Sequence, residues 1–228
     1  MLDQLIIGEK ASYDDFGASV AYRTIEQPKK KEIKETIPFS NVTYDFSAIN
    51  GEVYWNERKL EYVFEMTAST PQELEGMKIA FASWVMNVQD EKIFDPFIAD
   101  YHFKGTFSEM SFDDDESVEK TTATVAFMVY PYKIANVEIT VITEISYTAS
   151  GNMQRNVEIV NNSSHRLMPT VVVEGNVSIK VGNATIDVGS GTYVDYAFYL
   201  PAGESKWVIT NKGTNIAKVT ISFFEEVF

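Results

Sequence analysis

The sequence contains no cysteine among its 228 residues. This absence excludes a disulfide scaffold, a zinc site built on thiolates and a cysteine nucleophile. A chain of this length buries roughly 70% of its extended surface on folding, so its core needs neither a disulfide nor a structural metal. Apolar packing and backbone hydrogen bonds must therefore hold the fold together.

Positive charge is scarce as well. The chain has 19 lysine and arginine residues against 33 aspartate and glutamate residues, a net charge of −14. Nucleic acids and anionic membranes bind basic surfaces, so we expect neither as a partner. The most basic stretch is Lys29-Lys30-Lys31, but Glu26, Glu32 and Glu35 dilute its charge. We interpret it as a solvated loop or strand edge, with a phosphate-binding patch as the alternative.

Long hydrophobic runs are also missing. The first ten residues, MLDQLIIGEK, have too short an apolar run and no basic segment for a signal peptide. No stretch reaches the roughly 20 apolar residues of a membrane span. We therefore expect a soluble protein made in the cytoplasm.

Residue patterns that indicate catalysis or metal binding are lacking. The two histidines, His102 and His165, have no ligand partner at metal-site spacing, and no nucleophile-elbow pattern surrounds the serines before His165. The acidic run Asp113–Glu116 lacks the glycine and the distal glutamate of an EF-hand loop. We interpret it as a solvated loop, with a cation site as the alternative. We expect no catalytic residue, no cofactor and no metal.

Strand patterns dominate what is present. Leu60, Tyr62, Phe64 and Met66 alternate with mostly charged residues, which predicts a strand with one buried face. Asn50-Gly51 is a favoured tight-turn dipeptide. Residues 42–49 and 52–66 are therefore predicted to pair as a hairpin whose long second arm projects beyond the core.

One segment is predicted to be a helix. Thr70 suits the N-cap, Pro71 the first helical position, and Glu73 completes a capping box. Apolar residues follow at helical spacing: Leu74, Met77, Phe81, Trp84, Val85 and Val88. We expect this apolar face to dock on a sheet, with a ligand groove as the alternative.

The pattern changes near residue 131. Residues 101–110 and 121–129 read as strands, and Pro131 then ends the second one. Beyond residue 137, short β runs are separated by turn residues at intervals of roughly 8–12 residues, which is typical of a β-sandwich of jelly-roll type. The sequence therefore predicts a mainly β protein with domains at residues 1–133 and 134–228.

Aromatic residues are frequent in the second predicted domain. Tyr193, Tyr196, Tyr199 and Trp207 are expected to belong to the sandwich core. The alternative is that some of them stack on sugar rings, with Tyr193 and Trp207 as candidate glycan contacts. On that interpretation the protein is a carbohydrate-binding module that recognises glycans of a host cell wall.

An ordered set of motifs resembles a known family. These are "SYDDFG" (residues 12–17), "YDFSAINGEVYWNERKLEYVFEM" (44–66), the capped helix with its tryptophan, "YHFKGTF" (101–107) and "ATVAFMVYPYKI" (123–134). Together with the all-β C-terminal segment, they resemble the distal tail protein family of long-tailed bacteriophages and prophages of Gram-positive bacteria. The motifs cover residues 1–133, and residues 134–228 match in length and strand content.

This resemblance implies a structural protein without enzymatic activity. Family members form a homohexameric ring at the tail tip, which joins the tail tube protein to the tail-associated protein and serves as a baseplate hub for receptor-binding proteins. Their first domain, with a β-sandwich-like sheet, a helix and a hairpin, builds the ring. Their second domain resembles galectin-like or carbohydrate-binding modules. The resemblance places the protein in the virion, after synthesis and assembly in the host cytoplasm.

The hairpin supplies candidate interface residues. A ring of identical subunits needs a head-to-tail contact, and a projecting hairpin reaches a neighbour. Aromatic residues are enriched in such contacts. We therefore predict Tyr44, Tyr54 and Trp55 as interface anchors, with Asn50 and Gly51 at the turn. The alternative is that these side chains pack within their own subunit.

Overall fold

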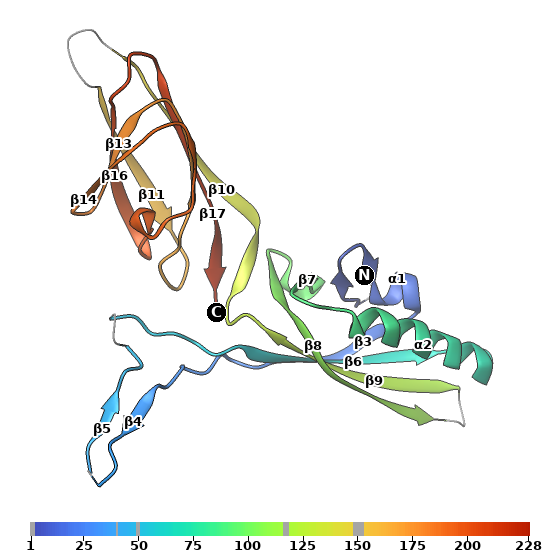
Figure 1. The fold of residues 1–228 in the computed structure, drawn as a ribbon. Helices are drawn as coiled ribbons and strands as arrows, with labels where there is room; N and C mark the ends of the chain where they lie inside the picture. The colour runs from blue at the N-terminus through green and yellow to red at the C-terminus, as the bar shows by residue number, and fades with distance from the viewer. Residues whose placement is uncertain (1–2, 40, 49–50, 116–118, 148–152) are drawn as a thin grey trace. The chain divides into compact units, whose positions relative to one another are not determined.

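The computed structural model describes residues 3–39, 41–48, 51–115, 119–147 and 153–228. The chain is mainly β, as predicted, and it divides into two compact units (Figure 1). The first unit consists of residues 1–133 together with Phe228, and the second of residues 134–227. None of the helices in the described ranges has the length and apolarity that crossing a membrane requires.

The first unit combines one curved antiparallel sheet with two α-helices. Its sheet has the strand order β3-β6-β9-β8-β7-β1-β2. The strands are β1 (Ile6–Ile7), β2 (Lys10–Ala11), β3 (Ser19–Ile25), β6 (Arg58–Thr67), β7 (Glu91–Phe94), β8 (Tyr101–Asp115) and β9 (Lys120–Val129). The helices are α1 (Ser12–Phe16), α2 (Pro71–Met86) and a 3-10 turn η1 (Pro96–Ile98). A second, separate sheet contains only β4 (Lys34–Thr36) and β5 (Thr43–Asp45).

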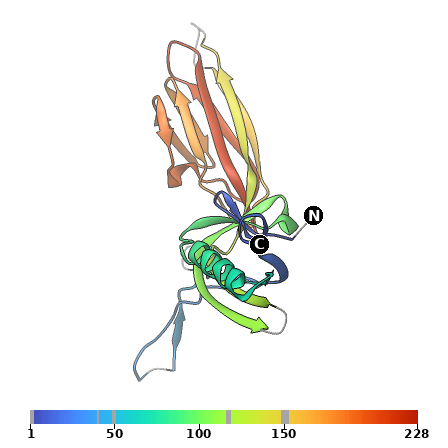
Figure 2. The same cartoon turned by 90° about the vertical axis from the view of Figure 1, so that its right-hand side faces the viewer.

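The core of this unit lies between the sheet and α2. Figure 2 shows α2 lying across one face of the sheet. The alternating residues of β6, predicted to be its buried face, are fully buried there: Leu60, Tyr62, Phe64 and Met66. Phe81 of α2 packs edge-on against Phe64, with ring centroids 5.0 Å apart. The apolar stripe of the helix is therefore a packing face, as expected.

The predicted helix start is confirmed. The Thr70 side chain accepts a hydrogen bond from the backbone N–H of Glu73 at 3.2 Å, and Pro71 opens the helix. The Glu73 carboxylate accepts in return from the N–H of Ser69 at 3.0 Å, one residue before the cap. These bonds satisfy donors that the first helical turn cannot pair internally.

The predicted hairpin between residues 42–49 and 52–66 is wrong. β5 pairs with β4, whereas β6 lies between β3 and β9. Leu60, for example, is opposite Ile25 on one side and Phe127 on the other. Pairing with β3 and β9 satisfies backbone groups along both edges of β6, whereas a hairpin with residues 42–49 would satisfy only one edge. Gly51 still forms a turn, since its N–H donates to the Ala48 carbonyl at 2.9 Å, and Asn50 lies outside the described residues.

The acidic run is not wholly a loop. β8 continues through Asp113–Asp115, which pair in register with Thr122, Thr121 and Lys120 of β9. The strand continues through these residues because their backbones pair with β9 while their acidic side chains remain in contact with water. Glu116, the last residue of the run, lies outside the described residues.

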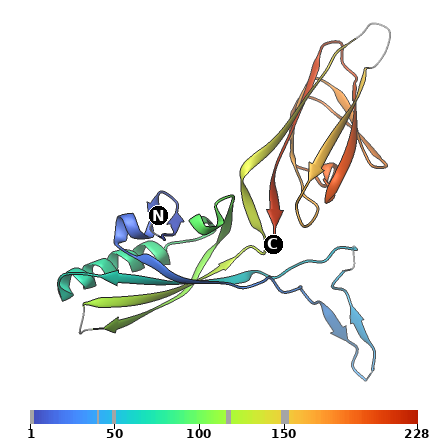
Figure 3. The same cartoon turned by 180° about the vertical axis from the view of Figure 1, so that it is seen from behind.

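The second unit is a sandwich of two antiparallel sheets (Figure 3). One has the order β15-β12-β17-β10 and the other β11-β16-β13-β14. The strands are β10 (Lys133–Ile145), β11 (Gln154–Asn161), β12 (Thr170–Glu174), β13 (Val177–Val181), β14 (Ala184–Val188), β15 (Gly191–Tyr193), β16 (Gly203–Asn211) and β17 (Ala217–Val227). A 3-10 turn, η2 (Tyr196–Phe198), precedes β16. The core between the sheets includes Ile179, Phe198, Trp207 and Ile221.

Candidate assembly surface

An arm, which we define as residues 26–57, connects β3 to β6. Its base continues the β3–β6 pairing: the Lys31 N–H donates to the Tyr54 carbonyl at 2.8 Å, and the Asn56 N–H donates to the Lys29 carbonyl at 2.8 Å. Its outer part is the β4–β5 ribbon, which Figure 1 shows as a separate blue hairpin. Three residue pairs join β4 and β5.

The arm has almost no core of its own. Every described residue between positions 29 and 46 is exposed, and no arm residue belongs to either cluster of buried hydrophobic residues. The exposed apolar side chains are Ile33, Ile37, Phe39, Val42, Tyr44, Phe46, Val53 and Tyr54. An isolated two-stranded hairpin is marginally stable in water, and apolar side chains gathered on a surface mark an interaction site. The arm therefore has the properties of a segment that is completed by a partner.

Polar bonds, rather than packing, shape the ribbon. Ser47 is buried, and its hydroxyl accepts from the Ile33 N–H at 2.8 Å. The Asp45 carboxylate accepts from the Ser47 N–H at 2.9 Å, which closes a turn just after β5. Hydrogen bonds from the Ser47 side chain and backbone lower the pKa of Asp45. The ribbon thus keeps its shape while its apolar side chains stay exposed.

The structure separates the residues predicted as interface anchors. Tyr44 and Tyr54 are 47% and 45% exposed, and Tyr44 stacks on Phe46 with ring centroids 6.3 Å apart. Trp55 instead packs edge-on against Phe228 of the same unit, at 4.9 Å. Gly51 is exposed, with a φ of 76° that favours glycine. Of the three predicted anchors, Tyr44 and Tyr54 are exposed, whereas Trp55 packs within its own unit.

The predicted set omitted the outer apolar residues of the arm. Ile33, Ile37 and Phe39 are 44%, 49% and 110% exposed. Their signal in the sequence was a shared spacing: positions 33, 37 and 39 differ by four and two residues within the charged stretch "KKKEIKETIPFSNV" (residues 29–42), which suits one face of a strand. This spacing could have identified them.

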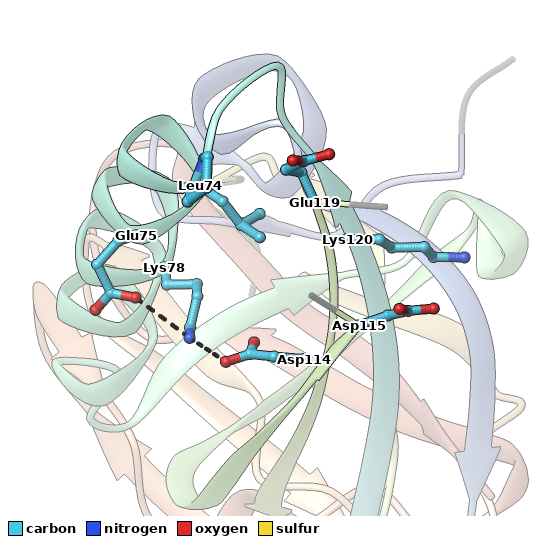
Figure 4. Close-up of a pocket in the computed structure, with 8 residues that line it drawn as sticks. Leu74, Glu75, Lys78, Asp114, Asp115, Glu119 and Lys120 are labelled. Carbon is cyan, nitrogen blue, oxygen red and sulfur yellow. Dashed lines mark hydrogen bonds and ion pairs between the residues drawn. The ribbon is translucent and has the colours of Figure 1, made fainter. Parts of the chain in front are cut away.

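A pocket of about 400 Å³ lies between α2 and the ends of β8 and β9. In Figure 4, Lys78 lies between Glu75 and Asp114, and its Nζ contacts their carboxylates at 3.3 and 2.8 Å. The hydrogen bond to Asp114 raises the pKa of Lys78 and lowers that of Asp114. Mutual pairing of this kind holds the helix to the sheet.

Metal and triad chemistry find no support in the described ranges. No group of three or more His, Cys, Asp or Glu side chains among these residues could hold a metal ion. Asp114, from the acidic run, is hydrogen-bonded to Lys78. His102 is buried against Phe94 in the first unit, whereas His165 contacts Glu226 in the second, with Nε2 3.1 Å from Oε2.

The candidate glycan contact Trp207 is wrong. Its side chain is fully buried in the sandwich core, 6.0 Å from the Phe198 ring, and a buried indole cannot stack on a sugar. Tyr193 is partly buried and donates its hydroxyl hydrogen to the Gly189 carbonyl at 3.0 Å. Tyr196 and Tyr199 are more exposed, and their rings lie 4.6 and 5.8 Å from the Arg166 guanidinium.

Comparison with known proteins identifies the fold. No protein-family model matches the chain, and no curated protein sequence matches it significantly. A solved structure does: the crystal structure of SPP1 Dit (gp 19.1), described as a paradigm of the hub adsorption apparatus in phages that infect Gram-positive bacteria. Its TM-score is 0.68 at 11% identity, and the match covers 98% of this chain and 99% of that one. This chain has the fold of a phage distal tail protein.

Two structures of the phage P2 baseplate in its activated conformation also match. The structure with Ca has a TM-score of 0.36 at 7% identity, and the match covers 97% of this chain and 98% of that one. The structure with Sr has a TM-score of 0.40 at 8% identity, with 98% of both chains covered. These scores are too low to argue a shared fold. The resemblance inferred from the sequence motifs is confirmed by the likeness to the SPP1 distal tail protein.

Proposed function

We propose that this protein is a structural subunit of a phage or prophage tail tip. In this proposal its first unit forms a hexameric ring, and the arm of each subunit docks on the next one. The observation that carries the proposal is the arm itself, whose described residues from 29 to 46 are all exposed although many are apolar. The fold likeness to a hub protein, over nearly the whole of both chains, supports the same role.

The energetics favour docking of the arm. Burying the remaining exposed surface of an Ile, Phe or Tyr side chain contributes about 1 kcal/mol, since complete burial contributes roughly 1.5–3 kcal/mol. The exposed apolar side chains of one arm together provide on the order of 10 kcal/mol. Association costs roughly 4–15 kcal/mol, so one docked arm brings the contact near balance. A closed ring, in which every subunit gives and receives an arm, repeats this gain at each interface.

The ring requires a heterologous interface. The ribbon of one subunit and its docking surface on the next differ, so the contact runs head to tail and closes into a ring when the rotation allows. The proposed partners above and below the ring are the tail tube protein, the tail-associated protein and receptor-binding or baseplate proteins. We propose assembly in the host cytoplasm, a final location in the virion, and no enzymatic role.

Light scattering and negative-stain microscopy test this proposal. The purified chain, measured over a concentration series, is expected to reach six times the subunit mass of 25.7 kDa and to show rings. A chain that stays monomeric at every concentration, alone and with tail partners, and that forms no ring in virions would contradict the proposal.

Glycan binding by the second unit is a second candidate function. The observation that favours it is the exposed pair Tyr196 and Tyr199 flanking Arg166, an arrangement that offers both stacking surfaces and a hydrogen-bond donor. The test is binding to cell-wall polysaccharide of the host, measured for the intact chain and for Tyr196→Ala. Binding that Tyr196→Ala abolishes without a change in melting temperature supports it, and no binding by the intact chain removes it.

A further inference from the structure

Arg58, the first residue of β6, carries a buried charge that forms no ion pair with any residue in the described ranges. It lies on the same strand face as Leu60 and Tyr62, and its exposed fraction is 2%. Its Nε and Nη2 atoms are buried, and neither has a hydrogen-bond partner. A buried guanidinium nearly always donates its hydrogen bonds, because an unpaired buried charge destabilises the fold. This arrangement needs an explanation beyond packing.

An aromatic ring and a second cation are the neighbours that the structure shows for Arg58. Its guanidinium stacks over the Phe103 ring at 5.1 Å. Burial lowers the pKa of Arg58, while burial and then the charge of Arg58 lower the pKa of Lys133. No ion pair among the described residues includes either side chain, whereas Arg23 pairs with both Asp3 and Asp95. Among the residues that the structure describes, Arg58 and Lys133 thus influence each other while neither forms an ion pair, in a chain whose net charge is −14.

We propose that Arg58 and Lys133 form a receptor for a carboxylate that a second copy of this chain supplies. This inference rests on the proposed ring and names a contact that would hold it together. The planar guanidinium fork binds a carboxylate through two parallel hydrogen bonds, and Lys133 adds a second charge. A carboxylate there would satisfy the Nε and Nη2 donors and relieve the repulsion between the two cations.

The opposite end of the same sheet supplies the carboxylate. Arg58 is opposite Val129 at one end of the β6–β9 pair, and Thr67 is opposite Lys120 at the other. The acidic segment Asp113–Asp115 lies at that second end, where Asp115 pairs with Lys120. β6 has ten residues, so the two ends are about 30 Å apart and cannot meet within one subunit. A head-to-tail contact between copies brings them together.

The arm provides access to the receptor. Arg58 follows it directly in the chain, and the Lys29–Lys31 segment pairs with residues 54–56 just before Arg58. Because Arg58 is buried in the single subunit, the proposed contact requires that docking of the arm shift residues 54–56 and expose the guanidinium. The exposed lysines of the segment also add positive charge at the same end of the sheet.

The test is Arg58→Met, measured for stability and for assembly. Methionine fills the buried space and removes the unpaired charge, so the melting temperature of the dilute monomer is expected to rise. Ring assembly is expected to weaken by about tenfold or more, because the receptor is lost. The double variant Asp113→Asn, Asp115→Asn is expected to weaken assembly as well. Adding these two substitutions to Arg58→Met is expected to weaken assembly little further, because the contact is already lost. The matched control is Arg155→Met, an exposed arginine of the second unit, which is expected to change neither quantity.

The possible outcomes separate this inference from the proposed function. If the wild type forms rings and Arg58→Met assembles equally well, the receptor is wrong and the ring stands. If the wild type forms no ring, the proposed function fails, and this inference fails with it. Parallel loss of stability and assembly in Arg58→Met would show a purely structural role and would overturn the receptor.

Two further measurements complete the test. Lys133→Met gives an independent variant should Arg58→Met fail to fold, and it is expected to weaken assembly without lowering the melting temperature. Inorganic phosphate tests for a free anion. One result would show that the site binds a free anion: phosphate raises the melting temperature of the wild type but not that of Arg58→Met. If, in addition, neither carboxylate substitution changes assembly, the carboxylate receptor is overturned.

Discussion

The Tyr62 hydroxyl donates a hydrogen bond to the Asp95 carboxylate across 3.2 Å, in the core of the first unit. Both side chains are almost entirely buried. The same carboxylate accepts from the Phe97 N–H at 3.0 Å and forms an ion pair with Arg23 Nε at 3.0 Å. This network joins β3, β6 and the turn before β8. It pairs the charge of Arg23 with a buried acid, whereas Arg58 has no such ion pair in the described ranges.

Tyr62→Phe is expected to lower the free energy of unfolding by about 1–2 kcal/mol, because it removes one hydrogen bond from a buried carboxylate. Urea denaturation at pH 7 measures the change. The control is Tyr22→Phe, since Tyr22 is 64% exposed and its substitution is expected to be neutral. Equal stability of the Tyr62→Phe variant and the wild type would show that the bond contributes nothing.

The same bond predicts a loss of stability in alkali. Burial, and then the charge of Asp95, raise the pKa of Tyr62 above its ordinary value of 10.0. Below pH 10 both folded and unfolded states keep the proton, so the stability is fully present. As the pH rises above 10 the unfolded state releases the proton first, and the unfolding free energy falls by about 1.4 kcal/mol per pH unit.

Denaturation at pH 9 to 11.5 checks this sign. The wild type is expected to lose stability more steeply than Tyr62→Phe, which has no such proton to release. Identical slopes for the two proteins would contradict the assigned pKa shift. The Tyr22→Phe variant again serves as the control and should follow the wild type.

The helix cap predicts a smaller effect. Thr70→Ala removes the acceptor for the Glu73 N–H and is expected to cost about 1 kcal/mol of stability, whereas Thr70→Ser keeps the acceptor and is expected to be close to neutral. Thermal unfolding followed by circular dichroism measures both. A Thr70→Ser variant as unstable as Thr70→Ala would show that packing of the threonine methyl matters more than the cap.

Trp207→Ala is expected to destabilise the second unit by about 3–5 kcal/mol, because it leaves a cavity between the two sheets. Tyr196→Ala, on the surface of the same unit, is expected to change stability by less than about 0.5 kcal/mol. Chemical denaturation followed by near-UV circular dichroism distinguishes them. A well-folded Trp207→Ala variant of nearly unchanged stability would contradict the core assignment.

Local patterns in the sequence predicted much of this fold. The alternation along residues 60–66 identified the buried face of β6, and the Thr70–Glu73 signature identified the start of α2, because both depend on neighbouring residues. The strand partner of β6 depends on residues far away in the chain, such as Phe127, so the Asn50-Gly51 turn led to the wrong hairpin. Composition alone could not separate buried Trp207 from exposed Tyr196, because both lie in aromatic segments of the second unit, although Tyr196 belongs to the turn η2 and Trp207 to β16.

The candidate site was predictable only in part. Tyr44 and Tyr54 were predicted as interface anchors from their aromatic side chains. Both side chains are exposed, and their place at an interface stays a prediction. Ile33, Ile37 and Phe39 were missed because charged residues and a proline separate them, so that their shared spacing did not stand out as one face of a strand. Arg58 lies at the start of a predicted strand, but its neighbouring residues do not indicate that this strand buries its side chain or that no acidic side chain pairs with it in the described ranges.

Sedimentation velocity on the wild type and on the double variant Ile37→Ser, Phe39→Ser tests the central claim most directly. Both substituted side chains are exposed, so the monomer is expected to keep its melting temperature. The wild type is expected to sediment as a hexamer, and the variant as a monomer at the same concentration. A variant that forms rings as readily as the wild type would contradict the claim that the arm holds the ring together.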